Sequence, residues 1–154
     1  MDKVKIAETR LIGISLQKST TNTNGQSGID CKELWDQFVH DKHIESIIGK
    51  VNDNIFGVYC KYEGNSSKPF SYFVGCEVEK DATIPHGLQS IIIPEGVYFK
   101  IQAKGKMPDC VKGAWQEIWE ANLPRTYQTD FEVYDERSKD WNEAEVDIYL
   151  SVED

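Results

Sequence analysis

The chain has 154 residues, the length of one domain, and its 26 acidic against 17 basic residues give a formal net charge of −9. Ten of the acids and two of the bases lie in residues 130–154. Such a surface repels phosphate backbones, and no basic stripe offsets it, so direct nucleic-acid binding is not expected. No apolar run of 18 residues occurs, and therefore no membrane-spanning helix is expected.

Composition also narrows location and chemistry. Residues 1–10 lack the apolar segment of a signal peptide, which favours a cytoplasmic protein. The cysteines and histidines do not recur at metal-ligand spacing, and no phosphate-binding loop is visible, so neither a metal nor another cofactor is expected. Acidity favours cationic partners, although it is equally the ordinary means of keeping a protein soluble.

The first half of the chain predicts a strand followed by a helix. Residues 8–17 (ETRLIGISLQ) are rich in β-forming side chains, and the polar residues 18–28 after them predict a loop. A helix is expected to open at Asp30, because Glu33 follows at the spacing of a capping box. Its apolar side chains recur at helical spacing: Leu34, Trp35, Phe38 and Val39.

Two strands come next, over residues 54–63 and 70–79, and after the linker at 80–87 the order of elements starts again. Residues 88–105 predict strand structure around a Pro-Glu-Gly turn. A helix is predicted over residues 107–124, where one proline suits the first turn and another ends the helix. The last two strands are expected within the segments TDFEVYDER and EVDIYLSV.

The two halves also match residue by residue. CKELWDQF aligns with VKGAWQEI at an offset of 80 and superposes Trp35 on Trp115. IFGVY (55–59) aligns with DFEVY (130–134) at an offset of 75. Two matches in the same order indicate a duplicated β-α-β-β unit, with repeat one at about 1–80 and repeat two at about 88–154.

The second match contains one conspicuous difference. Alternate residues of a strand face opposite sides, so Glu132 and Tyr134 share one face, and the twin of Glu132 in the first repeat is Gly57. A carboxylate opposed to a missing side chain suggests a pocket along the pseudo-two-fold axis. The alternative is that Glu132 is an ordinary solvent-facing strand residue.

Five blocks of this sequence resemble a known family: GVYCKYE, YFVGCEV, IPHGLQSIIIPEGVY, AWQEIWEANLP and DFEVYDER…EVDIYLSV. They are similar to the effector-binding domain of the AraC/Rob/BmrR regulators, and most of all to its stand-alone, gyrase-inhibitor-like (GyrI-like) branch. The resemblance implies an α+β fold, in which two β-α-β-β repeats form antiparallel sheet structure flanked by two main helices around a central ligand cavity. A single effector-binding domain is expected over residues 1–154, without a DNA-binding domain.

The resemblance further implies a ligand and a site. Members similar to this chain bind bulky aromatic organic cations, and the family's acidic pocket residue maps onto Glu132. The aromatic walls would come from the helices and paired strands: Trp35, Phe56, Tyr59, Trp115, Trp119, Tyr134 and Tyr149. The tryptophans lie on apolar helical stripes and are equally well read as core residues.

Three functions therefore compete. The first is a stand-alone sensor or sequestering protein for lipophilic organic cations. The second, implied by relatives similar to small-molecule hydrolases, is the opening of strained-ring genotoxic compounds, with Glu132 as general base and Tyr134 as acid or oxyanion partner. The third is a protein partner role, as in inhibition of DNA gyrase, through the acidic surface. If the protein is a sensor or sequestering protein, no catalytic residue is expected.

Overall fold

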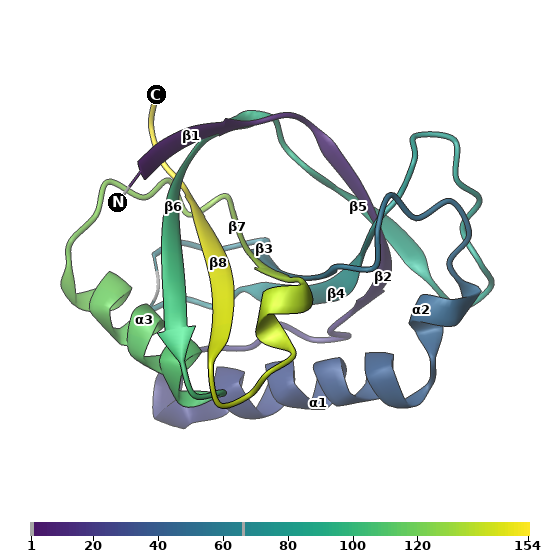
Figure 1. Cartoon of the computed structure of the whole chain (residues 1–154). Helices are drawn as coiled ribbons and strands as arrows, with labels where there is room; N and C mark the ends of the chain where they lie inside the picture. Colours follow the sequence, from purple (N-terminus) through teal and green to yellow (C-terminus); the bar gives the residue numbers. More distant parts are fainter. Residues whose placement is uncertain (1, 66) are drawn as a thin grey trace.

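The computed structural model describes residues 2–65 and 67–154, and within these ranges eight strands form one antiparallel sheet that curls over on itself (Figure 1). The strands are β1 (Asp2–Ile6), β2 (Thr9–Ser15), β3 (Ile55–Cys60), β4 (Ser71–Glu77), β5 (Gln89–Ile93), β6 (Gly96–Gly105), β7 (Thr129–Tyr134) and β8 (Ala144–Ser151). The α-helices are α1 (Gln26–His40), α2 (His43–Ser46) and α3 (Asp109–Glu120), and short 3-10 turns cover η1 (Thr23–Gly25) and η2 (Glu136–Ser138).

The sheet has internal two-fold symmetry. Its strand order is β1-β6-β8-β7-β3-β4-β2-β5, and raising or lowering each number by four returns the same order read backwards. The axis passes between β3 and β7, where the two repeats pair with each other. This confirms the predicted α+β fold built from duplicated units.

Each repeat also carries one extra leading strand. The first of these, β1, was not predicted, since it is a short edge strand with mostly exposed or half-buried side chains.

The first helix begins earlier than predicted. It opens at Gln26, after Gly25 in a left-handed conformation with φ 72°, so that Asp30 lies inside the helix instead of capping it. The Asp30 carboxylate accepts hydrogen bonds from Thr20 Oγ1 at 2.7 Å and from Gln26 Nε2 at 2.8 Å. The segment predicted as a loop is therefore partly ordered by secondary structure, and Thr20 also pairs with Phe70 through the backbone.

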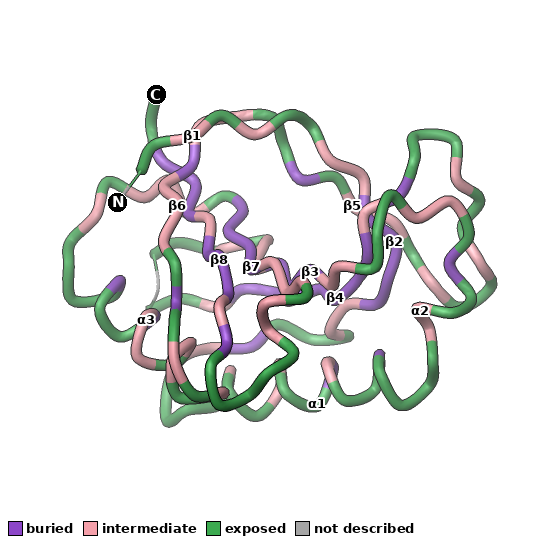
Figure 2. Tube along the Cα trace, viewed as in Figure 1, coloured by how far each residue is buried: buried purple, intermediate pink, exposed green. Residues whose placement is uncertain are grey.

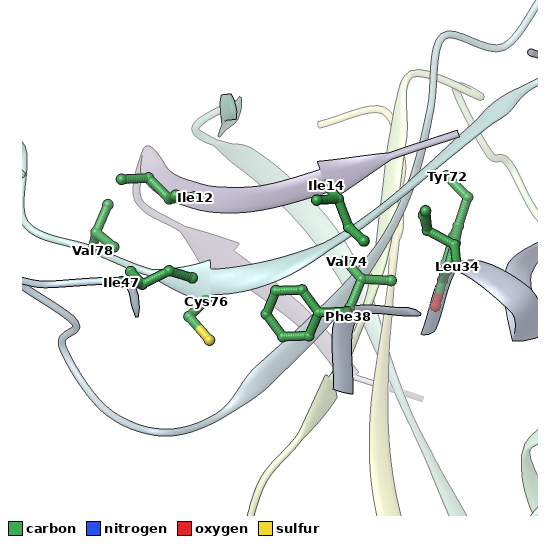
Figure 3. Packing of buried hydrophobic residues seen from close by; sticks show 9 residues of the cluster. All are labelled: Ile12, Ile14, Leu34, Phe38, Ile47, Tyr72, Val74, Cys76 and Val78. Carbon is green, nitrogen blue, oxygen red and sulfur yellow. The ribbon is translucent and has the colours of Figure 1, made fainter. Parts of the chain in front are cut away.

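Both long helices cover the same face of the sheet. Leu34 and Phe38 of α1 pack on alternate residues of β2 and β4, in the cluster that Figure 3 shows. Trp115 and Ile118 of α3 pack on alternate residues of β8. A third cluster, which includes Phe73 and Phe131, fills the opposite face inside the curl. Buried residues accordingly follow the central strands, while much of α1 and α3 is exposed (Figure 2). In the described ranges, none of the helices is long and apolar enough to cross a membrane.

Candidate functional site

The symmetry axis of the sheet passes through the pair formed by Gly57 and Glu132. These residues lie directly opposite each other where β3 and β7 pair, and the flanking pairs repeat on either side. Glu132 is 1% exposed and lies on the face of the sheet that the helices cover, with Tyr134 on the same face, as the alternation predicted. The interpretation of Glu132 as a solvent-facing strand residue is therefore wrong, since the carboxylate lies at the centre of the molecule.

Three side chains donate hydrogen bonds to this carboxylate. Trp115 Nε1 donates to Oε2 at 2.6 Å. Tyr59 donates its hydroxyl to Oε2 at 3.1 Å, and Tyr134 donates its hydroxyl to Oε1 at 2.9 Å. Both carboxylate oxygens are thus bound by donors from two strands and from α3.

The rings around the carboxylate repeat the symmetry of the fold. Trp35 of α1 meets Tyr134 edge to face, with ring centroids 4.5 Å apart, and Trp115 of α3 meets Tyr59 in the same way at 5.0 Å. Each pair joins a residue of one repeat to a residue of the other. We call Glu132, Tyr59, Tyr134, Trp35 and Trp115 the Glu132 cage.

The two sides of the cage are not equivalent. Trp115 is 8% exposed and bonded to the carboxylate, whereas Trp35 is only half-buried. Among the described residues, the donors to Glu132 do not include the Trp35 indole. One wall of the cage is consequently fixed to the acid, and the other is held by ring contact.

Gly57 provides room for this arrangement. A Cβ atom at Gly57 would overlap the Tyr72 hydroxyl and would stand 3.1 Å from Glu132 Oε1. The Tyr72 ring lies 4.9 Å from that of Tyr59, so it extends the aromatic wall of the cage. Tyr72 was not predicted, although alternation within residues 70–79 puts it on the helix-facing side of a strand next to Tyr59.

Burial dominates the ionisation of the cage. It raises the pKa of Glu132 above its ordinary value, and the hydrogen bonds from Trp115, Tyr134 and Tyr59 lower that pKa by a smaller amount. Burial and the charge of Glu132 together hold the pKa of Tyr59 and Tyr134 well above the usual range. The phenols therefore keep their protons and act as donors, while the carboxyl is the group that can titrate.

Glu132 differs from the other buried acids in lacking a cationic partner. Asp130 pairs with Arg125 at 2.7 Å, and Asp147 pairs with Arg137 at 2.6 Å. Among residues 2–65 and 67–154, no basic side chain forms an ion pair with Glu132, and its hydrogen-bond donors are all neutral. A buried carboxylate without a counterion is costly, and an added cation would remove that cost.

The Arg125–Asp130 pair forms a second group next to the cage. Asp130 Oδ2 accepts from Arg125 and, at 2.8 Å, from the Tyr62 hydroxyl, and the Arg125 guanidinium stands 4.3 Å from the ring centroid of Tyr127. Burial by itself lowers the pKa of Arg125, but the charge of Asp130 and its hydrogen bond outweigh burial and leave that pKa raised. We call these four residues the Asp130 cluster. No sequence pattern pointed to it, because Arg125 comes from an irregular segment.

Three of the predicted site residues lie elsewhere. Phe56 and Tyr149 both stack on Phe131 in the cluster on the opposite face of the sheet. The structure does not bring them to Glu132, since strand alternation turns them to the other side. Trp119 lies 6.4 Å from Trp115 between ring centroids and is 47% exposed, at the outer border of the cage.

A groove of about 390 Å³ lies beside α1 and not over the axis. Its lining comes from β2 and the two residues after it, from α1, and from residues 87–89 at the start of β5, and includes Leu16, Asp30, Glu33 and Gln89. The cage residues are not part of that lining, because their rings pack against one another. A ligand that reaches Glu132 must therefore part these rings.

A duplicated, curled sheet with one helix from each repeat over its axis defines an effector-binding domain of the gyrase-inhibitor-like class, as predicted. The chain belongs to the family of integron-associated effector binding proteins (Cass2), whose model matches residues 4–152.

Similar proteins agree with this assignment. The putative transcriptional regulator protein YobU of Bacillus subtilis (strain 168) is 27% identical over 124 residues, which is 77% of either chain. An integron cassette protein of Vibrio cholerae superposes with a TM-score of 0.71 at 22% identity, covering 99% of this chain and 95% of that one. The structure of SAV2435 bound to tetraphenylphosphonium superposes with a TM-score of 0.79 at 18% identity, covering 99% and 93%. At such identities the solved structures establish the fold.

Proposed function

We propose that this protein binds a lipophilic organic cation against Glu132, as a sensor or sequestering protein. One observation supports this most directly: Glu132 is a buried carboxylate that has three neutral donors and, among the described residues, no cationic partner. A bound cation supplies the missing charge. Family membership and the tetraphenylphosphonium-bound neighbour support small-molecule binding in general.

The rings of the cage suit a cation with apolar substituents. Faces of Trp and Tyr attract a positive charge by about 0.5–2 kcal/mol each, and they accept many ligand shapes. We place the ligand on the side of Trp35, because this ring is half-buried and is not bonded to the carboxylate. Displacing Trp35 from Tyr134 breaks a ring contact and leaves the Trp115 hydrogen bond in place.

Titration with tetraphenylphosphonium tests the proposal, with neutral triphenylphosphine oxide as a ligand of similar shape. We expect Glu132→Gln to weaken binding of the cation about a hundred-fold and to leave binding of the neutral compound nearly unchanged. Glu117→Gln is the matched control, since it removes the same charge from an exposed position on α3. Cation binding that is equally strong in Glu132→Gln would contradict the proposal.

The remaining alternatives stay predictions. A hydrolase would return a chemically altered ligand, which mass analysis of the recovered compound detects. A protein that modulates gyrase would inhibit supercoiling even as Glu132→Gln, because its acidic surface and not the cage would act.

A further inference from the structure

The Asp130 cluster lies beside the Glu132 cage on the same face of one strand. Asp130 and Glu132 are two residues apart on β7, so both side chains point toward the helices. Trp115 links the two groups. Its indole nitrogen donates to Glu132 at 2.6 Å, and the Arg125 guanidinium carbon lies 5.8 Å from the centroid of its ring. The Trp115 indole therefore lies between the Arg125 charge and the Glu132 carboxylate.

The two groups together contain one uncompensated charge. The Arg125 and Asp130 side chains are 3% and 0% exposed, and their 2.7 Å ion pair cancels one positive and one negative charge. Asp130 is held in place from its other side by the backbone N–H of Ser151 at 2.8 Å. The charge that remains belongs to Glu132, which one positive charge neutralises.

A second positive charge would find no partner here. The neighbouring carboxylate on this face of β7, that of Asp130, is already neutralised by Arg125. Charges interact strongly across a few ångströms of buried protein, because little water screens them. A dication bound at the cage would leave a buried positive charge uncompensated, which is strongly unfavourable.

We infer that the Arg125–Asp130 ion pair restricts the Glu132 cage to ligands that carry a single positive charge. Arg125 neutralises the carboxylate next to Glu132, so that a second cationic centre finds no counterion, and Asp130 cancels the field of Arg125 so that the first centre can bind. Both are specificity-determining residues in this scheme. The inference rests on the proposed function and adds the charge of the ligand to it.

The first experiment titrates tetraphenylphosphonium into Asp130→Asn and into the double variant Arg125→Gln/Asp130→Asn. Asp130→Asn leaves Arg125 uncompensated, so we expect cation binding at least ten-fold weaker than in the wild type. The double variant removes both charges, and binding should return to within about three-fold of the wild type. Neutral triphenylphosphine oxide should bind the wild type and both variants equally well. A structural defect in Asp130→Asn would instead weaken the binding of the neutral compound too.

The second experiment uses three rigid ligands of similar shape at pH 8: neutral 4-phenylpyridine, the monocation N-methyl-4-phenylpyridinium and the dication methyl viologen. The wild type should bind the monocation at least ten-fold more tightly than the dication. Arg125→Gln exposes Asp130 as a second carboxylate, and the preference for the monocation should then fall at least ten-fold. If Arg125→Gln does not fold, the wild-type preference and the first experiment decide the question.

Three results would overturn the inference: a wild type that binds the dication as tightly as the monocation, a folded Asp130→Asn that binds tetraphenylphosphonium normally, or a double variant that fails to recover. Each leaves the proposed function standing, provided that Glu132→Gln still weakens cation binding about a hundred-fold. Cation binding that is equally strong in Glu132→Gln overturns both.

Discussion

The two acids on the helix-facing side of β7 are buried alike but are neutralised differently. Asp130 is 0% exposed and is paired with Arg125, whereas Glu132 is 1% exposed and is bonded by Trp115, Tyr59 and Tyr134. Both the Asp130 cluster and the Glu132 cage also contain aromatic rings. The Asp130 cluster thus contains an internal cation in an aromatic setting. The Glu132 cage has a similar setting without one, which is the arrangement that a ligand cation would complete.

Position in the fold accounts for the difference. Arg125 lies in the segment between α3 and β7, and this segment runs alongside the end of β8 through the pairing of Arg125 with Val152. Asp130 is near that end of the sheet. Glu132 is on the two-fold axis, opposite Gly57 and between the two helices, where strand and helix side chains fill the surroundings.

The largest expected effect is a difference in unfolding free energy between variants that alter the surroundings of Asp130 and of Glu132. Arg125→Met leaves the buried Asp130 carboxylate without a counterion and should lower the free energy of unfolding by about 3–5 kcal/mol. Glu132→Gln removes a buried charge that has no counterion, so the free energy of unfolding should stay constant or rise. Urea denaturation measures both. Lys32→Met is the control, since it breaks an exposed ion pair and should change stability by less than about 1 kcal/mol. Equal losses in Arg125→Met and Glu132→Gln would contradict the comparison.

A second test adds a methyl group on the axis. In Gly57→Ala the new Cβ meets the Tyr72 hydroxyl and approaches Glu132, so we expect a loss of about 1–3 kcal/mol in unfolding free energy. Adding Tyr72→Phe removes the overlapping oxygen and should recover part of that loss. Gly28→Ala serves as the control, because its Cβ would meet nothing within 4 Å and alanine favours the helix. A loss in Gly28→Ala as large as that in Gly57→Ala would disprove the explanation.

A third test asks which side of the cage is fixed to the acid. Trp115→Phe removes the 2.6 Å hydrogen bond and should lower the unfolding free energy by about 1.5–3 kcal/mol, while it raises the pKa of Glu132 further. Trp35→Phe keeps every donor to the carboxylate and should leave this pKa in place. A carbon-13 NMR titration of the Glu132 carboxyl distinguishes the two variants. An equal rise of the pKa in both would show that ring packing, and not the hydrogen bond, sets it.

The smallest effect concerns pH. Because the pKa of Glu132 is raised in the folded state, the folded protein holds this proton more tightly than the unfolded chain does. Its contribution to stability is therefore complete below the unfolded pKa and is lost as the pH rises through the folded pKa. The loss is about 1.4 kcal/mol for each ten-fold difference in proton affinity between the folded and unfolded chain. Subtracting the pH profile of the unfolding free energy of Glu132→Gln from that of the wild type isolates this contribution.

Cation affinity should change in the opposite direction and rise with pH over the same interval. An affinity that does not change with pH would exclude a titrating Glu132.

Much of the fold followed from local patterns. The strands that became β2 to β8 and the two long helices were predicted from alternation, helical spacing and turn residues. The start of α1 was misplaced, because a capping-box pattern at Asp30 also fits the interior of a helix that begins at Gln26. The edge strand β1 was missed, since its alternation of lysine with apolar residues is short and its burial is shallow.

The site was predicted in its centre and less well at its borders. Glu132, Tyr59, Tyr134, Trp35 and Trp115 come together, as the family resemblance implied. Phe56 and Tyr149 were included because the family resemblance implies aromatic walls from the paired strands, but the strand period turns both away from the carboxylate.

The sequence by itself determined the duplication, the alternation that puts Glu132 and Tyr134 on one face of a strand, and the glycine that is the twin of Glu132, because each depends on short-range periodicity or on a comparison of the chain with itself. Only the tertiary structure decided that Gly57 lies directly opposite Glu132, that Tyr72 fills the space which the glycine leaves, and that Arg125 neutralises Asp130 instead of Glu132. These depend on strand register and on where an irregular segment runs. Contacts between distant residues settle both, and no local pattern encodes them.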